Sequence, residues 1–205
     1  MTQQWTGALV GLAVALVLAS STQAFDLSPK AQAMLARGEA HADVWADPDG
    51  ISGRVRGVID IDAPPQRVWA VMTDCATARK LMSNLTSCKV LSGEQARGSD
   101  IREHVTRRNL IFPGMRIVFR SDYEPQRRIR FTLVEGDLKI QQGEWRLQPL
   151  RGGKATRVFY DNRLAVDWPV PKAMIREAMR RDTPKVLVNL RRACEATDKA
   201  PAPAD

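Results

Sequence analysis

Between Thr86 and Val166 the sequence alternates apolar and polar residues in six separate segments. A period of two is typical of β-strands that have one buried and one solvated face. Short stretches rich in Gly, Pro and Asp separate the segments, and such short connections join antiparallel neighbours. The segments are 86–91, 100–108, 115–123, 128–135, 141–149 and 156–166. The sequence therefore predicts an antiparallel meander.

One long helix is expected after the last strand. Trp168-Pro169-Val170-Pro171 stops that strand, and apolar residues then recur at helical spacing from Lys172 to about Cys194. A strongly curved sheet has too much concave surface to fill by itself, so the helix must close it. The predicted fold class is α+β: a curved antiparallel sheet of six to seven strands wrapped around a long C-terminal helix, with a hollow between them.

The part of the chain before the meander predicts helices and a hairpin. Ser28-Pro29 is typical of an N-cap followed by proline at the first helical position, and the helix should run to about Arg37. The segments 39–46 and 51–62 flank a strong turn signal, Asp47-Pro48-Asp49-Gly50, and predict a hairpin. After Ala63-Pro64-Pro65 we expect two short helices, the second over 76–82.

The N-terminus predicts export. The first 24 residues contain no Asp, Glu, Lys or Arg, and an apolar run extends from Ala8 to Ala19. This run is shorter than the ~20 residues that a membrane-spanning helix needs. Thr22-Gln23-Ala24 resembles a signal peptidase site, so cleavage is expected between Ala24 and Phe25, giving a periplasmic or secreted protein. The alternative is an uncleaved anchor, because no Lys or Arg precedes the run.

These signals divide the chain into four parts. Residues 1–24 form the expected signal peptide, 25–50 an N-terminal helix and hairpin arm, and 51–196 the main domain. The tail over 197–205 has no apolar periodicity and is expected to be disordered.

The formal net charge of +8 comes from Lys and Arg residues scattered along the chain rather than clustered. A solvated basic face explains this pattern, and such a face could also attract an anionic membrane surface. Because an exported protein rarely meets nucleic acid, we expect no nucleic-acid partner.

The three cysteines are Cys75, Cys88 and Cys194. Export would place them in an oxidising compartment, and Cys75 and Cys88 close a short loop, so we expect a disulfide between them. The alternative is three buried free thiols. The spacing, with no histidine nearby, makes a poor zinc site, and we expect no metal and no cofactor.

The segment from Ile59 to Asp74, IDIDAPPQRVWAVMTD, resembles the opening of the START-like helix-grip superfamily. That superfamily includes polyketide cyclases, ring-hydroxylase subunits and coenzyme Q-binding START proteins. The stretch GEWRLQPL at 143–150, followed by Thr156-Arg157-Val158, is similar to its sixth and seventh strands. The resemblance covers about Gly53 to Arg192 and implies an apolar ligand held between sheet and helix. Cys75 stands where an aromatic residue is common, which supports the disulfide.

A helix-grip pocket would be lined by one face of each strand and by the long helix. Periodicity nominates as ligand-binding residues Phe119, Tyr123, Phe131, Gly143, Trp145, Tyr160, Asn162, Met174 and Ala178. The alternative is that these side chains simply fill a core. A glycine among large residues leaves room, however, and methionine adapts to varied ligands.

Glu103 shares a strand face with Ile101 and Val105, which would turn Glu103 inward and Arg102 and His104 outward. A buried carboxylate is costly without a partner. Glu103 would therefore contact the ligand, act as an acid or base, or pair with an arginine of a neighbouring strand. A register shift of one residue would invert the assignment.

The leading functional hypothesis is a monomeric, non-enzymatic carrier of a lipid, quinone or other hydrophobic molecule. The only histidines are His41 and His104, and no catalytic triad or metal cluster can be assembled with them. The alternative is a cyclase- or hydrolase-type enzyme that uses Glu103 with Tyr160 or Tyr123. Partnerless polar groups in the pocket would favour the enzyme, and apolar walls would favour the carrier.

Overall fold

The structure is a computed structural model that describes residues 27–49, 52–108, 113–168 and 170–196. The expected signal peptide, its cleavage site between Ala24 and Phe25, and the expected disordered tail lie outside the described residues.

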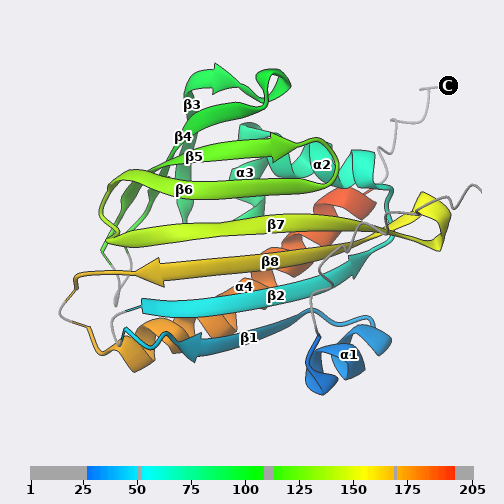
Figure 1. Cartoon of the computed structure of the whole chain (residues 1–205), viewed down its shortest axis with the longest axis horizontal. Helices are drawn as coiled ribbons and strands as arrows, with labels where there is room; N and C mark the ends of the chain where they lie inside the picture. Colours follow the sequence, from blue (N-terminus) through cyan, green and yellow to red (C-terminus); the bar gives the residue numbers. More distant parts are fainter. Residues whose placement is uncertain (1–26, 50–51, 109–112, 169, 197–205) are drawn as a thin grey trace, which may run out of the picture.

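Eight strands form one curved antiparallel sheet in the order β1-β2-β8-β7-β6-β5-β4-β3 (Figure 1). The strands are β1 His41–Ala46, β2 Ser52–Ile61, β3 Leu85–Glu94, β4 Ser99–Thr106, β5 Arg116–Glu124, β6 Arg128–Gly136, β7 Ile140–Leu150 and β8 Ala155–Ala165. The predicted helix-grip class is confirmed, with eight strands instead of six to seven. The eighth strand is β1, the first arm of the predicted hairpin, which pairs antiparallel with β2 and extends the sheet at that edge.

The helices include a short one at the start of the described chain, a connected pair in the middle and one long helix at the end. They are α1 Pro29–Ala36, α2 Pro65–Thr73, α3 Cys75–Leu81 and α4 Lys172–Glu195, with short 3-10 turns η1 Gln95–Arg97 and η2 Arg151–Gly153. Ser28 caps α1 by accepting a hydrogen bond from the backbone N–H of Ala31. Asp74 caps α3 through the N–H groups of Ala76 and Thr77, which fixes the corner between α2 and α3.

We call the face of the sheet that packs against α2, α3 and α4 the inner face. The main core lies there, where β2, β7 and β8 contact α2 and α4. Ile59 and Val158 from the sheet meet Val68 of α2 and Leu187 of α4, and all four are almost completely buried. Helix α1 packs instead on the opposite, outer face, against Val58 and Phe159.

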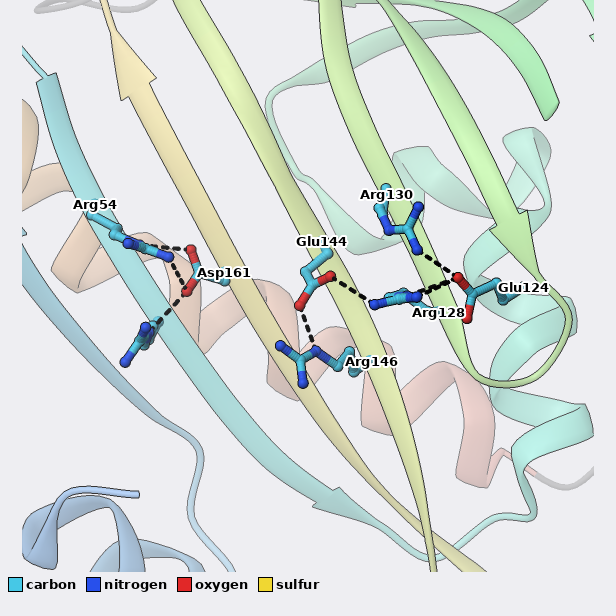
Figure 2. A network of polar contacts seen from close by, with 8 residues as sticks. Arg54, Glu124, Arg128, Arg130, Glu144, Arg146 and Asp161 are labelled. Carbon is cyan, nitrogen blue, oxygen red and sulfur yellow. Dashed lines mark hydrogen bonds and ion pairs between the residues drawn. The ribbon is translucent and has the colours of Figure 1, made fainter. Parts of the chain in front are cut away.

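Arginine–carboxylate pairs cover the outer face of the sheet (Figure 2). Three carboxylates each hold two arginines: Asp161 holds Arg54 and Arg56, Glu144 holds Arg128 and Arg146, and Glu124 holds Arg128 and Arg130. Exposed pairs of this kind contribute little stability individually. They do neutralise much of the positive charge that the alternating strands carry on this face.

Within the described part of the chain, no helix combines the length and the apolar character that a membrane span requires.

Candidate ligand-binding cavity

A cavity of about 120 Å³ lies between the inner face of the sheet and helices α3 and α4. Its walls are mostly apolar: Met72, Ala78, Leu81, Met82, Phe119, Ile129, Phe131, Trp145, Val186 and Leu190. One polar patch interrupts these walls, formed by Arg102, His104, Ser121 and Tyr123. The volume is below the ~300 Å³ typical of small-molecule sites. A lipid-sized ligand therefore requires adaptable wall residues such as Met72 and Met82 to move.

The polar patch exists because β4 turns its even-numbered residues inward. Arg102 pairs across the sheet with Phe119, and His104 pairs with Ile117. Glu103 faces the other side, where its carboxylate accepts a hydrogen bond of 2.6 Å from Nε of Arg116. The expectation that Glu103 points inward is therefore wrong, and β4 faces the opposite way from the predicted one. The expected pairing of Glu103 with an arginine of a neighbouring strand is confirmed. The apolar pattern of Ile101 and Val105 was misleading because a charge-compensated pair occupies the inner face.

The charge-compensated pair on the inner face consists of Asp100, which is 3% exposed, and Arg102, which is 7% exposed. Nε of Arg102 lies 3.0 Å from both carboxylate oxygens, and Nη2 lies 2.9 Å from one of them. Nη1 donates to the carbonyl oxygen of Thr73 at 2.8 Å. Burial alone would lower the pKa of Arg102, but hydrogen bonding and electrostatic attraction from Asp100 and Tyr123 together outweigh burial and raise the pKa. All three guanidinium nitrogens are thus engaged, and the charge is balanced.

Tyr123 completes this network. Its hydroxyl donates to Asp100 at 2.9 Å, and its ring packs edge-on against Trp69 at 5.9 Å between centroids. Burial raises the pKa of Tyr123 to about 12, so the phenol stays protonated.

His104 lies beside the network, with its ring 4.8 Å from the ring of Phe119 in an edge-to-face arrangement. Burial, assisted by the positive charge of Arg102, lowers the pKa of His104 to about 4. The imidazole is therefore neutral near pH 7, with one nitrogen able to donate and the other able to accept a hydrogen bond.

Only some of the residues that the sequence predicts to bind a ligand lie around the cavity. Phe119, Tyr123, Phe131 and Trp145 line it. Tyr160 supports the wall, because its ring stacks against Trp145 at 4.2 Å and Phe131 at 6.2 Å.

The helix residues nominated from sequence lie away from the cavity. Met174 is 44% exposed, and the half-buried Ala178 is not among the wall residues. The first half of α4 instead packs over β2, where Arg176 and Met179 approach Gly53. Only the second half of the helix reaches the cavity, through Val186 and Leu190.

Gly143 does not leave room for a ligand. A Cβ atom at this position would lie 2.0 Å from the backbone oxygen of Asp161 and 2.8 Å from Cζ of Phe131. The glycine is required by the close approach of β8 and of the Phe131 ring.

Sequence reasoning missed Arg102, His104 and the wall formed by α3. A signal for the first two is present: Asp100, Arg102 and His104 are three polar residues spaced by two within one strand. No comparable periodicity singles out Ala78, Leu81 and Met82, because a seven-residue helix has too few turns to show a stripe.

The predicted disulfide between Cys75 and Cys88 is confirmed, with 5.4 Å between the Cα atoms. It joins the first residue of α3 to β3, and α3 forms one wall of the cavity. Cys194 is free and buried, and burial raises the pKa of its thiol to about 12. No cluster suited to a metal ion is found in the described ranges.

A basic cleft lies on the far side of α3, between this helix and β3. It is lined by Ala76, Arg79, Lys80, Ser83, Leu85, Thr86 and Arg107. No carboxylate lines the cleft, and Arg79, Lys80 and Arg107 form no ion pair with another described residue. This arrangement differs from the outer face of the sheet, where arginines are paired.

Residues 61–191 match the family model described as polyketide cyclase / dehydrase and lipid transport. No curated protein matches the chain significantly.

Solved structures of similar fold include an enzyme and lipid-transfer proteins. The STAR-related lipid transfer protein from Xanthomonas axonopodis is 15% identical (TM-score 0.60), with 75% of this chain and 98% of that one covered. The Zhui aromatase/cyclase from Streptomyces is 17% identical (TM-score 0.56; 70% and 91% covered). The human StarD13 lipid transfer and protein localization domain is 14% identical (TM-score 0.62; 78% and 86% covered). At these identities the likeness shows a shared START-like fold.

Proposed function

Since this chain belongs to the polyketide cyclase / dehydrase and lipid transport family, we propose that it is a non-enzymatic carrier. Its cargo is an apolar molecule that has a neutral hydrogen-bonding group. The observation that carries this proposal is the composition of the cavity: ten apolar side chains surround one charge-compensated polar patch.

The polar patch favours a neutral oxygen over an ion. Arg102 directs all three nitrogens to Asp100 and Thr73, so its charge is already balanced. The neutral imidazole of His104 remains available to a ligand, and the Ser121 hydroxyl, which hydrogen-bonds to Tyr123, can still accept a hydrogen bond. A hydroxyl, carbonyl or quinone oxygen can bond to these groups without bringing a charge into an apolar cavity.

The cyclase- or hydrolase-type alternative has weaker support from the same groups. General acid–base catalysis works best when the catalytic pKa is near the working pH. The pKa of His104 is lowered to about 4 and that of Tyr123 is raised to about 12. Glu103, the other candidate, lies on the outer face and pairs with Arg116. These values suit hydrogen bonding better than proton transfer.

The proposal includes export to the periplasm as a monomer. Two features support export: the charge-free apolar run before Phe25, and the Cys75–Cys88 disulfide, which is typical of oxidising compartments. The proposal further places the basic cleft against anionic membranes, because unpaired cations beside the cavity wall would attract lipid headgroups there.

The carrier proposal is tested by recovering the cargo. The chain would be expressed with a C-terminal tag, purified from the bacterial envelope, and examined by native mass spectrometry. We expect a mass that lacks residues 1–24 and a noncovalent apolar adduct that solvent extraction releases. Protein with no adduct, which also takes up no fluorescent fatty alcohol or quinone, would contradict the proposal.

Membrane docking has a separate test with phosphatidylglycerol vesicles. The Arg79→Gln/Arg107→Gln double variant should sediment with them several-fold less than the parent chain. The control is Arg127→Gln/Lys154→Gln, which removes the same charge at exposed positions outside the cleft. Equal losses in both variants would show a general charge effect and contradict a docking site.

A further inference from the structure

Two buried oxygen atoms on the inner face have no hydrogen-bond partner among the described residues: Oε1 of Gln141 and Oδ1 of Asn162. The Asn162 residue is only 5% exposed. Buried polar groups in folded proteins are nearly always hydrogen-bonded, so these two unpaired oxygen atoms require a specific explanation.

The two amides lie close together on neighbouring strands. Asn162 of β8 is directly opposite Gly143 of β7, and Gln141 precedes Gly143 by two residues. Because residues two apart on a strand share a face, Gln141 and Asn162 are diagonal neighbours on the inner face.

The ring of Phe131 separates these amides from the cavity. Phe131 lines the cavity, and its Cζ atom lies over Gly143, 2.8 Å from where a Cβ atom would be. In the register of the sheet, Phe131 is opposite Gly143, which is in turn opposite Asn162. A path from the cavity to the amides would require the Phe131 side chain to move, together with the Tyr160 ring that stacks on it.

We infer that Gln141 and Asn162 form a second polar subsite, which binds a hydroxyl group at the far end of the cargo. A hydroxyl suits this position because it can donate to an amide oxygen and accept from an amide N–H, whichever way the amides are turned. The inference rests on the proposed carrier function and specifies the cargo as an apolar chain with a polar group at each end.

The register of the sheet also gives the length that the apolar part of the cargo should have. Ser121 of the polar patch is opposite Phe131, so Ser121, Phe131, Gly143 and Asn162 form one row across β5, β6, β7 and β8. Three strand spacings of about 4.8 Å separate the two ends of the row by about 14 Å. An extended chain advances about 1.2 Å per bond, so about twelve bonds span the distance.

Dodecanol and dodecanediol provide a matched pair of probes. Both have the same apolar chain and one hydroxyl for the first polar patch, and only the diol has a second hydroxyl. We expect the parent chain to bind the diol about tenfold more tightly, as is typical of one additional satisfied hydrogen bond at an otherwise unpaired buried group. Hexanediol is too short to reach both ends and should show no such gain over hexanol.

Asn162→Leu and Gln141→Leu each remove one of the acceptors, so each should greatly reduce the preference for the diol without weakening dodecanol binding. Gln141→Leu should also keep or raise the melting temperature of the ligand-free protein, because an unpaired buried polar group is removed. Asn162→Leu also removes the hydrogen bond between this side chain and Tyr160, so it should lower the melting temperature. The control is Gln142→Leu, at an exposed position on the opposite face of the same strand, which should keep the preference.

The outcomes separate this inference from the function on which it rests. Equal binding of dodecanol and dodecanediol by the parent chain would overturn the second subsite alone. Persistence of the diol preference in both leucine variants would do the same. Binding of neither compound would overturn the carrier proposal together with the subsite.

Discussion

The hydroxyl of Tyr123 lies 2.9 Å from each carboxylate oxygen of Asp100, and the same carboxylate holds the guanidinium of Arg102. The polar patch of the cavity therefore depends on one buried negative charge. Every polar side chain that lines the cavity from β4 and β5 lies within or next to this network.

Removal of that charge should be costly. Asp100→Ala leaves the guanidinium of Arg102 buried without a counterion, and we expect the free energy of unfolding to fall by about 3–5 kcal/mol. Urea denaturation of the parent and the variant measures this difference. The double variant Asp100→Leu/Arg102→Met removes both charges and should lose much less. If the double variant is as unstable as Asp100→Ala, the charge balance is not the cause.

His104 should make stability depend on pH between about 4 and 6.5. Its pKa is about 4 in the folded protein and 6.5 in an unfolded chain, so the unfolded state binds more protons within this window. Stability from the neutral imidazole is fully present above pH 6.5 and is lost as the pH falls towards 4, by about 3 kcal/mol in total. Denaturation of the parent and of His104→Leu at pH 7 and pH 4.5 isolates this effect. Identical pH dependence in both proteins would contradict burial of the neutral ring.

The Cys75–Cys88 disulfide should stabilise the fold by about 2–4 kcal/mol, because it constrains the unfolded chain. A reductant should lower the melting temperature of the parent chain and have no effect on the Cys75→Ser/Cys88→Ser variant. Native, unreduced protein should resist alkylation at all three cysteines, since Cys194 is buried and the pKa of its thiol is raised to about 12. Rapid labelling of Cys75 in native protein would show that the bridge does not form.

Gly143→Ala should be strongly destabilising, by more than about 3 kcal/mol, because its methyl group would collide with the backbone oxygen of Asp161. Gly53→Ala is the matched control on β2. There the nearest atom is a flexible Arg176 side-chain carbon at 3.3 Å, which can give way. Circular dichroism melting of both variants checks the difference. A stable Gly143→Ala protein would mean that β7 and β8 are further apart than described.

The fold was largely predictable from sequence because its determinants are local. The N-cap at Ser28, the proline break at Ala63-Pro64-Pro65 and the two-residue alternation each act within a few positions. The family resemblance then supplied the arrangement of the sheet around the long helix.

The site was harder to predict because its determinants are distant in sequence. Arg102 is tolerated on the inner face because Thr73 and Tyr123, 29 and 21 residues away in the numbering, help to satisfy the network. Periodicity alone cannot identify such compensation. The sequence pattern therefore predicts that Glu103, and not Arg102, points inward. The role of Gly143 was missed for the same reason, since its constraint comes from Asp161 on the next strand.

The central claim is that a cavity between sheet and α4 holds an apolar ligand, and filling that cavity tests it most directly. Val186 lines the cavity from α4, whereas Ala173 is exposed on the same helix. Uptake of a fluorescent fatty alcohol and thermal melting would be measured for the parent chain, Val186→Phe and Ala173→Phe. We predict uptake by the parent and by Ala173→Phe, at least tenfold weaker uptake by Val186→Phe, and an unchanged or raised melting temperature for Val186→Phe. No uptake by the parent, together with destabilisation of Val186→Phe by the ~1–3 kcal/mol typical of overpacking, would show that the space is solid core and contradict the claim.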